Sequence, residues 1–434
     1  MTGLRLSWRK LCYPPDYFGI ALFLLVVGLF FGAKAISSGH VFAILTFLLV
    51  LLNLRKWPCE WRHLRWSSWC LLAFLFLCAL SVFVNWEIAD YQGALLKKLR
   101  YPAIFLFFLL FPSLHHRIFE EIKKRDWLML GWVLPMIIAI FLGGVGMFTG
   151  KHPLRGTEVV DMDRLSGVYG QVMTFANTLQ FSVIALVMLT TSYFLCKKLS
   201  RTPWWLLVLA LFLGAAGLYL SYTRGAMLAC AAGMIVYAAM HSRSFLFWMV
   251  VIGLAATGIA FKEGARYSDS ESSLRVSQWK TASLAFLERP IRGYGYGNFE
   301  LQCIELKKKF GIETDLQPGQ RGATELTYFQ SHAHNNYLEA FVATGIFGGV
   351  AFLGFCFFWM REAMKSRYAL YFVPLIVAFL ISGFFENTFF DGEVLNAILL
   401  IYLFSQMVFN LEEQIGFNHS EASGAGSGLT TTET

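Results

Sequence analysis

A short polar segment stands directly before a long apolar one near residue 335. It reads Ser-His-Ala-His-Asn-Asn over residues 331–336 and runs into an apolar stretch that contains Gly345 and Gly348. An imidazole can change its charge near neutral pH, which makes histidine the side chain most often used as a general base. The carboxamide of Asn335 beside it could orient the ring. The pattern predicts that His334 acts as a base at a membrane surface, and the alternative is a histidine that only caps a helix.

Three arginines could bind the anionic part of a substrate. Arg224 lies in Ser-Tyr-Thr-Arg-Gly between two apolar runs, where a charge that slipped to the centre of the hydrocarbon core would cost about 2.5–3.5 kcal/mol. Arg275 precedes Trp279 by one helical turn, and Arg164 follows two aspartates. Because arginine forks bind phosphate oxygens bidentately, the three arginines predict a diphosphate site. The alternatives are an interface anchor for Arg224 and pairing with the neighbouring aspartates for Arg164.

The sequence gives no pattern for a metal or a nucleotide. His332 and His334 would point to opposite faces of an extended segment, and no Cys, Asp or Glu pair accompanies them at ligand spacing. The run Gly293-Tyr-Gly-Tyr-Gly297 has the glycines of a nucleotide loop, but no strand precedes it and no Walker lysine-serine pair follows it. We therefore expect a flexible turn there, and neither a metal nor a cofactor.

The composition places the chain in a membrane. Of its 434 residues 56% are hydrophobic and only 15% are charged, whereas a soluble domain has about 25% charged residues. Apolar runs close to the ~20 residues that cross a hydrocarbon core recur along the chain. The sequence therefore predicts an all-α polytopic membrane protein with about 12 transmembrane helices. They are placed at residues 17–34, 38–54, 68–84, 101–114, 127–149, 174–195, 204–221, 224–240, 244–261, 336–360, 368–385 and 391–410.

The charge of the connections predicts the orientation and the domain organisation. Lys and Arg concentrate on the side of both termini, which the positive-inside rule assigns to the cytoplasm. Residues 1–261 then form a transmembrane bundle of spans 1–9, residues 336–410 form spans 10–12, and the loop 262–335 faces the other side. Within that loop we expect one helix from a Ser272 or Ser273 cap to Arg289, and a second from Asn298 to Gly311. The tail 411–434 lacks apolar periodicity and is predicted to be disordered and cytoplasmic.

Taken in order, these motifs resemble the bacterial O-antigen ligase family, which is related to the O-antigen polymerases and the protein O-oligosaccharyltransferases. The resemblance rests on Arg224 in its Ser-Tyr-Thr-Arg-Gly segment and on a long loop that opens with Arg275 and Trp279. A Gly-Tyr-Gly-Tyr-Gly turn follows, and then His334-Asn-x9-Gly-x-x-Gly. The resemblance is strongest over residues 160–350.

The resemblance implies a GT-C-type membrane glycosyltransferase in the bacterial inner membrane, with the active site and the long loop facing the periplasm. Such an enzyme moves O-antigen polysaccharide from undecaprenyl diphosphate to a sugar hydroxyl of lipid A-core, by metal-independent inverting transfer. By this resemblance His334 is the base, with His332 as the fallback, and Arg224 and Arg275 bind the donor diphosphate. Arg164 is a weaker candidate for the same role, and the supporting residues are Asn335, Trp279 and Glu386, the last for acceptor positioning.

The partners implied are the undecaprenyl-diphosphate-linked glycan, the lipid A-core acceptor and membrane lipids, with no nucleic acid. An O-antigen polymerase or a protein O-oligosaccharyltransferase would share most of these motifs and remain alternatives. A transporter of lipid-linked glycan is the alternative from another class. A transporter would place charged residues in mid-span, whereas the distinctive charges here gather at one membrane face, which favours an enzyme.

Overall fold

A computed structural model describes residues 14–52, 54, 56, 58–88, 99–111, 127–154, 156, 158–159, 163–169, 171–195, 203–244, 269–312 and 332–426. Within these ranges the regular structure is helical, and the β-pairing consists of one isolated bridge between Lys151 and Glu158. The all-α prediction is confirmed.

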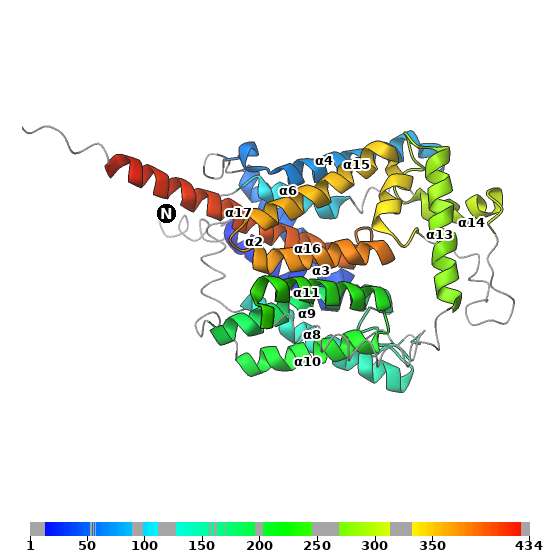
Figure 1. Cartoon of the computed structure of the whole chain (residues 1–434), viewed down its shortest axis with the longest axis horizontal. Coiled ribbons are helices and arrows are strands. Elements are labelled where there is room, and N and C mark those ends of the chain that lie inside the picture. The colour runs from blue at the N-terminus through cyan, green and yellow to red at the C-terminus, as the bar shows by residue number, and fades with distance from the viewer. Residues whose placement is uncertain are drawn as a thin grey trace, which may run out of the picture.

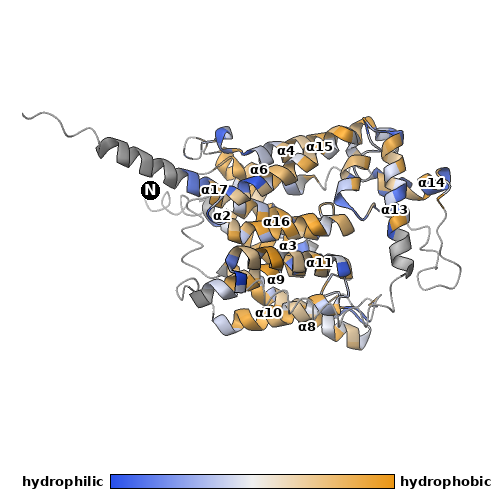
Figure 2. Ribbon diagram, in the orientation of Figure 1, coloured by the Kyte–Doolittle hydropathy of each residue, from blue (hydrophilic) through white to orange (hydrophobic). Residues whose placement is uncertain are grey.

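Long apolar helices lie side by side in a bundle (Figure 1), and most of their residues are hydrophobic (Figure 2). Among the described residues, seven helices are long and apolar enough to cross a membrane, and three more are shorter and apolar. The polytopic membrane protein predicted from composition is thereby confirmed, and each of these helices overlaps a predicted span. They are α2 (Pro14–Phe31), α3 (Ala33–Leu51), α4 (Trp66–Val84), α8 (Trp127–Thr149), α9 (Val172–Leu195), α10 (Trp204–Leu220), α11 (Arg224–His241), α15 (Asn336–Lys365), α16 (Ala369–Phe385) and α17 (Gly392–Gly426).

Two of the predicted spans have no described helix long enough to cross a membrane. The span expected at residues 244–261 lies almost wholly outside the described residues. The span expected at residues 101–114 corresponds to α6 (Arg100–Leu109), whose 10 residues extend about 15 Å at 1.5 Å per residue. That is about half of a ~30 Å hydrocarbon core, so the described part of this segment does not cross a membrane. Two short 3₁₀ helices, η1 (Trp61–His63) and η2 (Trp86–Ile88), flank α4.

The predicted disordered tail is wrong in its first part. The backbone of α17 stays helical to Gly426, well past the expected end of the last span at residue 410. Helix propagation adds one hydrogen bond for each residue fixed, and the chain directly after the span contains good helix formers such as Glu412, Glu413 and Gln414. The segment therefore continues a helix that is already anchored in the bundle.

Two helices outside the bundle lie at one end of it. α13 (Asp269–Glu288) runs across that end, with α14 (Asn298–Lys309) beside it (Figure 1). The first begins slightly before the predicted serine cap, and the second begins where it was predicted. Together with the start of α15 they enclose a small hydrophobic core separate from that of the bundle. It consists of Ala282, Ala285, Tyr294, Phe299, Cys303, Leu306, Ala333 and Val342.

α15 is broken at Gly345, and the glycine-tyrosine turn fills the break. The φ of Gly345 is 71°, a left-handed conformation that frees nearby backbone groups from their helical partners. The amide of Tyr294 donates to the Val342 carbonyl at 2.8 Å, and the amide of Gly295 donates to the Ala343 carbonyl at 2.9 Å. In return, the amide of Ile346 donates to Pro290 at 2.8 Å. Hydrogen bonds therefore connect the glycine-tyrosine turn to the break of α15 at Gly345, and this contact is called the joint below.

The joint lies at the same end of the bundle as the loops between helices that contain the candidate site residues. The amide of Tyr296 donates to Ser81 Oγ near the end of α4 at 3.0 Å. The amide of Leu165 donates to the carbonyl of Leu220 at the end of α10, also at 3.0 Å. These bonds hold loops far apart in sequence at one end of the bundle, which is the end that α13 covers.

Gly345→Ala should destabilise the protein. A side chain at this φ costs about 1–2 kcal/mol, and a Cβ here would also collide with the Ile291 carbonyl oxygen. We expect a lower unfolding temperature in detergent and a lower yield of monodisperse protein. Gly144→Ala in α8 is the matched control, because no atom lies within 4 Å of the Cβ it would add. If both variants unfold at the wild-type temperature, the joint does not constrain α15 as described.

Candidate active site

Glu386, the first residue after α16, brings two candidate residues together. Its Oε2 lies 2.9 Å from His334 Nδ1, and its Oε1 accepts a hydrogen bond from Arg275 Nη2 at 3.0 Å. Arg275 Nη1 also donates to the backbone carbonyl of Phe385 at 2.9 Å. The Glu386 side chain is only 8% exposed, whereas His334 and Arg275 are 21% and 24% exposed. The carboxylate is therefore buried beneath an imidazole and a guanidinium that both reach the surface.

The charge state of Glu386 follows from these neighbours. Burial raises the pKa of its carboxyl, but the charges and hydrogen bonds of His334 and Arg275 outweigh burial and hold the pKa below its ordinary value. An ionised carboxylate only accepts hydrogen bonds, so the bond to His334 uses the Nδ1–H of the ring. When the ring is in its neutral form, its Nε2 therefore carries the lone pair. This arrangement is the one a general base needs.

The backbone around His334 is held in an uncommon conformation. Its φ is 47°, in the left-handed region that non-glycine residues rarely adopt. Asn335 caps α15 by accepting hydrogen bonds from the amides of Tyr337 and Leu338 at 2.9 and 3.0 Å. Upstream, Glu339 accepts a bond from the amide of Ala333 at 2.9 Å. Because both flanks are fixed, the turn can keep His334 in a strained backbone geometry, as often occurs at functional sites.

Asn335 and its neighbour attach this turn to α16. Asn335 Nδ2 donates to the Phe384 carbonyl at 3.2 Å, and Asn336 Nδ2 donates to Thr388 Oγ1 at 2.8 Å. Asn336 Oδ1 also accepts a hydrogen bond from the Phe389 amide at 2.9 Å. The two carboxamides therefore position the turn and the Glu386 loop relative to each other, whereas the sequence suggested that Asn335 would orient the ring directly.

His332 lies beside His334, contrary to the sequence prediction. The two ring centroids are 4.4 Å apart. One ligand atom from each ring and one carboxylate oxygen of Glu386 all lie within 4.8 Å of one another. The prediction assumed an extended segment, and the turn at His334 removes that premise. The acidic group also comes from a part of the chain 52 residues away. The argument from spacing against a metal site was therefore wrong.

Arg224 reaches this region because α11 packs closely against α16. Gly225 and Gly233 lie on the α16 side of the helix, where an added Cβ would come within 2.8 Å of Phe385 Cβ and within 2.7 Å of the Pro374 carbonyl oxygen. Small residues at such spacing let membrane helices approach closely. Arg224 is the exposed first residue of α11. Its neighbour thus touches the residue that precedes Glu386.

Arg164 positions the turn before Arg224. Its Nε donates to the Ser221 carbonyl at 3.0 Å, and its Nη2 lies 3.4 Å from Thr223 Oγ1. Tyr222 between them has a φ of 50°, so this turn also holds a strained residue. Of the two neighbouring aspartates, Asp161 lies outside the described residues. These contacts explain the arginine as a support for the α10–α11 turn.

Trp279 follows Arg275 by one turn of α13, and its indole Nε1 is buried. Among the described residues it has no hydrogen-bond partner. A group enclosed in this way does not donate to a substrate in the present conformation.

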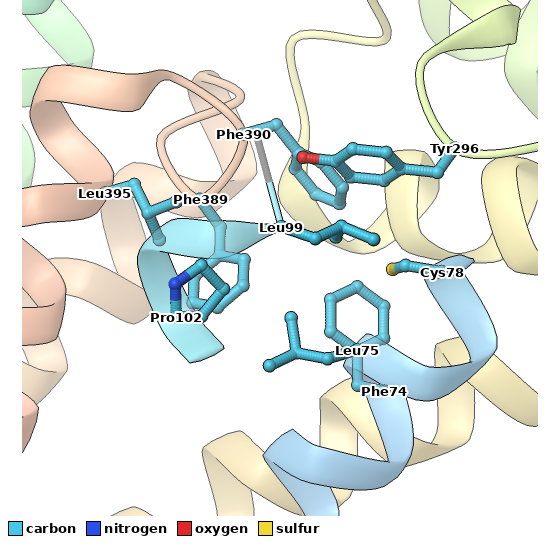
Figure 3. A pocket seen from close by; sticks show the side chains of 9 residues that line it. All are labelled: Phe74, Leu75, Cys78, Leu99, Pro102, Tyr296, Phe389, Phe390 and Leu395. Atoms are coloured by element: carbon cyan, nitrogen blue, oxygen red, sulfur yellow. The ribbon is translucent and has the colours of Figure 1, made fainter. Parts of the chain in front are cut away.

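An apolar hollow lies between α4 and the loop of residues 386–391 that joins α16 to α17 (Figure 3). Phe389 and Phe390 of that loop line it, opposite Tyr296 and the middle of α4. Its cavity volume is about 10 Å³, which leaves room for about one water molecule. It does not hold a sugar or a lipid chain. The ring of Phe390 instead packs 5.5 Å from that of Tyr296 and fastens the loop to the glycine-tyrosine turn.

The fold and this cluster define a polytopic all-α membrane protein with a polar, arginine-containing site at one end of its helix bundle. The family Wzy_C, described as O-Antigen ligase, matches residues 209–353. This segment contains Arg224, Arg275 and His334, and its match to the O-antigen ligase family confirms the resemblance found in the motifs. No curated protein matches the chain. Arg164 and Glu386 lie outside the matched segment.

Sequence reasoning missed the contacts that assemble the site. It did not predict Glu386 as the partner of His334, or Gly225 as the residue that admits Phe385. The close approach of Gly225 to Phe385 could have been predicted, because Gly225, Ala229 and Gly233 recur at every fourth position of α11. The contact of Glu386 with His334 has no local signal in the sequence.

Glu386→Gln should lower the unfolding temperature at neutral pH by removing the charge between His334 and Arg275. A carboxylate whose folded pKa is lowered stabilises the fold above its unfolded pKa, and that stability is lost as the pH falls through the folded value. The difference from wild type should persist to mildly acidic pH and shrink below about pH 4.5, the ordinary pKa.

Thermal unfolding across this pH range measures the difference. Glu305→Gln, at an exposed position on α14, is the control for the change in charge and should show little effect at any pH. A Glu386→Gln deficit that does not change with pH would contradict the proposed charge state.

Proposed function

We propose that this protein is an O-antigen ligase that transfers glycan from undecaprenyl diphosphate to a sugar hydroxyl of lipid A-core. The observation that carries the proposal is the contact of His334 with a buried, ionised Glu386, beside Arg275 and next to the start of α11. A base and two arginines at one end of a membrane bundle suit a donor whose lipid stays in the bilayer while its diphosphate reaches the surface. The family of residues 209–353 supports this class of reaction.

In the proposed reaction, the acceptor hydroxyl oxygen attacks the anomeric carbon of the donor glycan. His334 Nε2 takes the hydroxyl proton as the new C–O bond forms on the opposite side from the diphosphate. The bond from the anomeric carbon to the diphosphate oxygen breaks, and undecaprenyl diphosphate leaves with the electron pair. The configuration at the carbon inverts. A positioned base of this kind contributes about 10²–10⁴-fold in rate.

The arginines would stabilise the negative charge that develops on the leaving diphosphate. Arg275 has five N–H donors, and its contacts with Phe385 and Glu386 use two of its nitrogens. Its remaining donors are available to phosphate oxygens. Arg224 adds a second cation at the amino end of α11, where the helix dipole also favours an anion. Arg164 acts indirectly in this proposal, by fixing the turn before Arg224.

The remaining features of the proposal follow from the resemblance and the charge pattern. The protein would sit in the bacterial inner membrane with both termini in the cytoplasm, and the end covered by α13 would face the periplasm. The bundle would be of GT-C type, and the transfer itself would need no metal. Glu386 would serve the base, so its predicted part in positioning the acceptor would be indirect.

Loss of the gene should leave full-length glycan on undecaprenyl diphosphate and unmodified lipid A-core. Complementation with His334→Ala should leave the same lipids, because without a base the acceptor hydroxyl is not activated. Separation of the lipids on a gel and by mass spectrometry measures both. His241→Ala, at the far end of α11, is the matched control and should restore the wild-type ladder.

Two outcomes would contradict the proposal. Lipid A-core that carries a single repeat unit after loss of the gene would indicate a polymerase. A wild-type ladder from His334→Ala, with the protein present at wild-type level, would remove the base assignment.

A further inference from the structure

The cluster of His332, His334 and Glu386 has the composition of a transition-metal site. Two imidazoles and one carboxylate form the protein ligand set of many zinc enzymes, which leave a fourth position open. Imidazole nitrogens favour Zn²⁺, Co²⁺ and Ni²⁺, whereas Mg²⁺ and Ca²⁺ prefer oxygen ligands. The chemistry of the cluster therefore selects the first group of ions.

The geometry is close to what such an ion requires. Zinc bonds of about 2.0–2.2 Å at a tetrahedral angle place ligand atoms about 3.3 Å apart. The ligand atoms of the cluster lie within 4.8 Å of one another, and His334 Nδ1 and Glu386 Oε2 are 2.9 Å apart. Small rotations of the half-exposed rings would even out these separations, while the buried carboxylate stays in place.

The remaining oxygen of the carboxylate is already held. Arg275 Nη2 donates to Glu386 Oε1 at 3.0 Å, and Oε2 is the oxygen closer to His334 Nδ1, at 2.9 Å against 3.2 Å for Oε1. Metal-binding carboxylates are commonly hydrogen-bonded in this way by groups behind them. The positive charge of Arg275 would weaken the binding of a cation, so we expect affinity below that of a dedicated zinc enzyme.

We infer that His332, His334 and Glu386 form an inhibitory binding site for a divalent transition-metal ion such as Zn²⁺. The ion would replace the proton between His334 Nδ1 and Glu386. A neutral imidazole that binds metal through Nδ1 keeps its proton on Nε2, so the lone pair that would accept the proton of the acceptor is lost. The inhibition rests on the proposed role of His334 as base, whereas the binding does not.

The test uses the full-length protein with an affinity tag free of histidine, purified in detergent and treated with a chelator. Titration with Co²⁺ should give a visible d–d absorption band that Zn²⁺ abolishes by competition and that Mg²⁺ leaves unchanged. His332→Ala should weaken Co²⁺ binding by at least about tenfold, because one of three ligands is lost. His241→Ala, which lies outside the cluster, should bind as the wild type does.

A second readout separates the site from the function. Zn²⁺ should slow glycan transfer by the wild type over the concentrations at which it displaces Co²⁺. The absence of a Co²⁺ band, or His332→Ala binding as tightly as the wild type, would overturn the metal site. Binding that leaves transfer unchanged would uphold the metal site and overturn the role of His334 as base.

Discussion

The buried carboxylate of Glu386 is the group on which the rest of the site depends. It is 8% exposed, lies 2.9 Å through Oε2 from His334 Nδ1, and accepts a hydrogen bond from Arg275 on Oε1. Removing one partner of a buried ion pair typically costs about 3–5 kcal/mol, because it leaves a charge without compensation. The carboxylate therefore fixes the side chains of Arg275 and His334, which lie near the two ends of the loop 262–335. It also directs His334 Nδ1 toward the carboxylate.

The packing of the helices brings these groups to one end of the bundle. The break of α15 at Gly345 separates the short segment behind His334 from the long apolar helix. The amides of the glycine-tyrosine turn satisfy the carbonyls near this break. On the other side of Glu386, Gly225 lets α11 approach Phe385 closely enough to bring Arg224 to the same end. Glycines at a few points of close contact thus convert a membrane bundle into a scaffold for a polar cluster.

Much of the fold could be predicted from the sequence, because apolar runs have to be buried or placed in lipid. The span predicted at residues 127–149 coincides with α8, and His334 and Arg224 were identified because charged and titratable groups are rare beside such runs. The contact between His334 and Glu386 could not be predicted, since it joins residues 52 positions apart. The proximity of His332 and His334 depends on one positive φ, and such a backbone angle leaves no pattern in side-chain types.

The central claim is that Glu386 and His334 act as one unit in glycan transfer. A double-mutant cycle on the transfer rate of the purified protein tests it, with His334→Ala, Glu386→Gln and the double variant compared with the wild type. Residues that act as a unit have non-additive effects. We predict that the double variant is no slower than His334→Ala alone. Rate losses that multiply would show that the two residues act independently, and would contradict it.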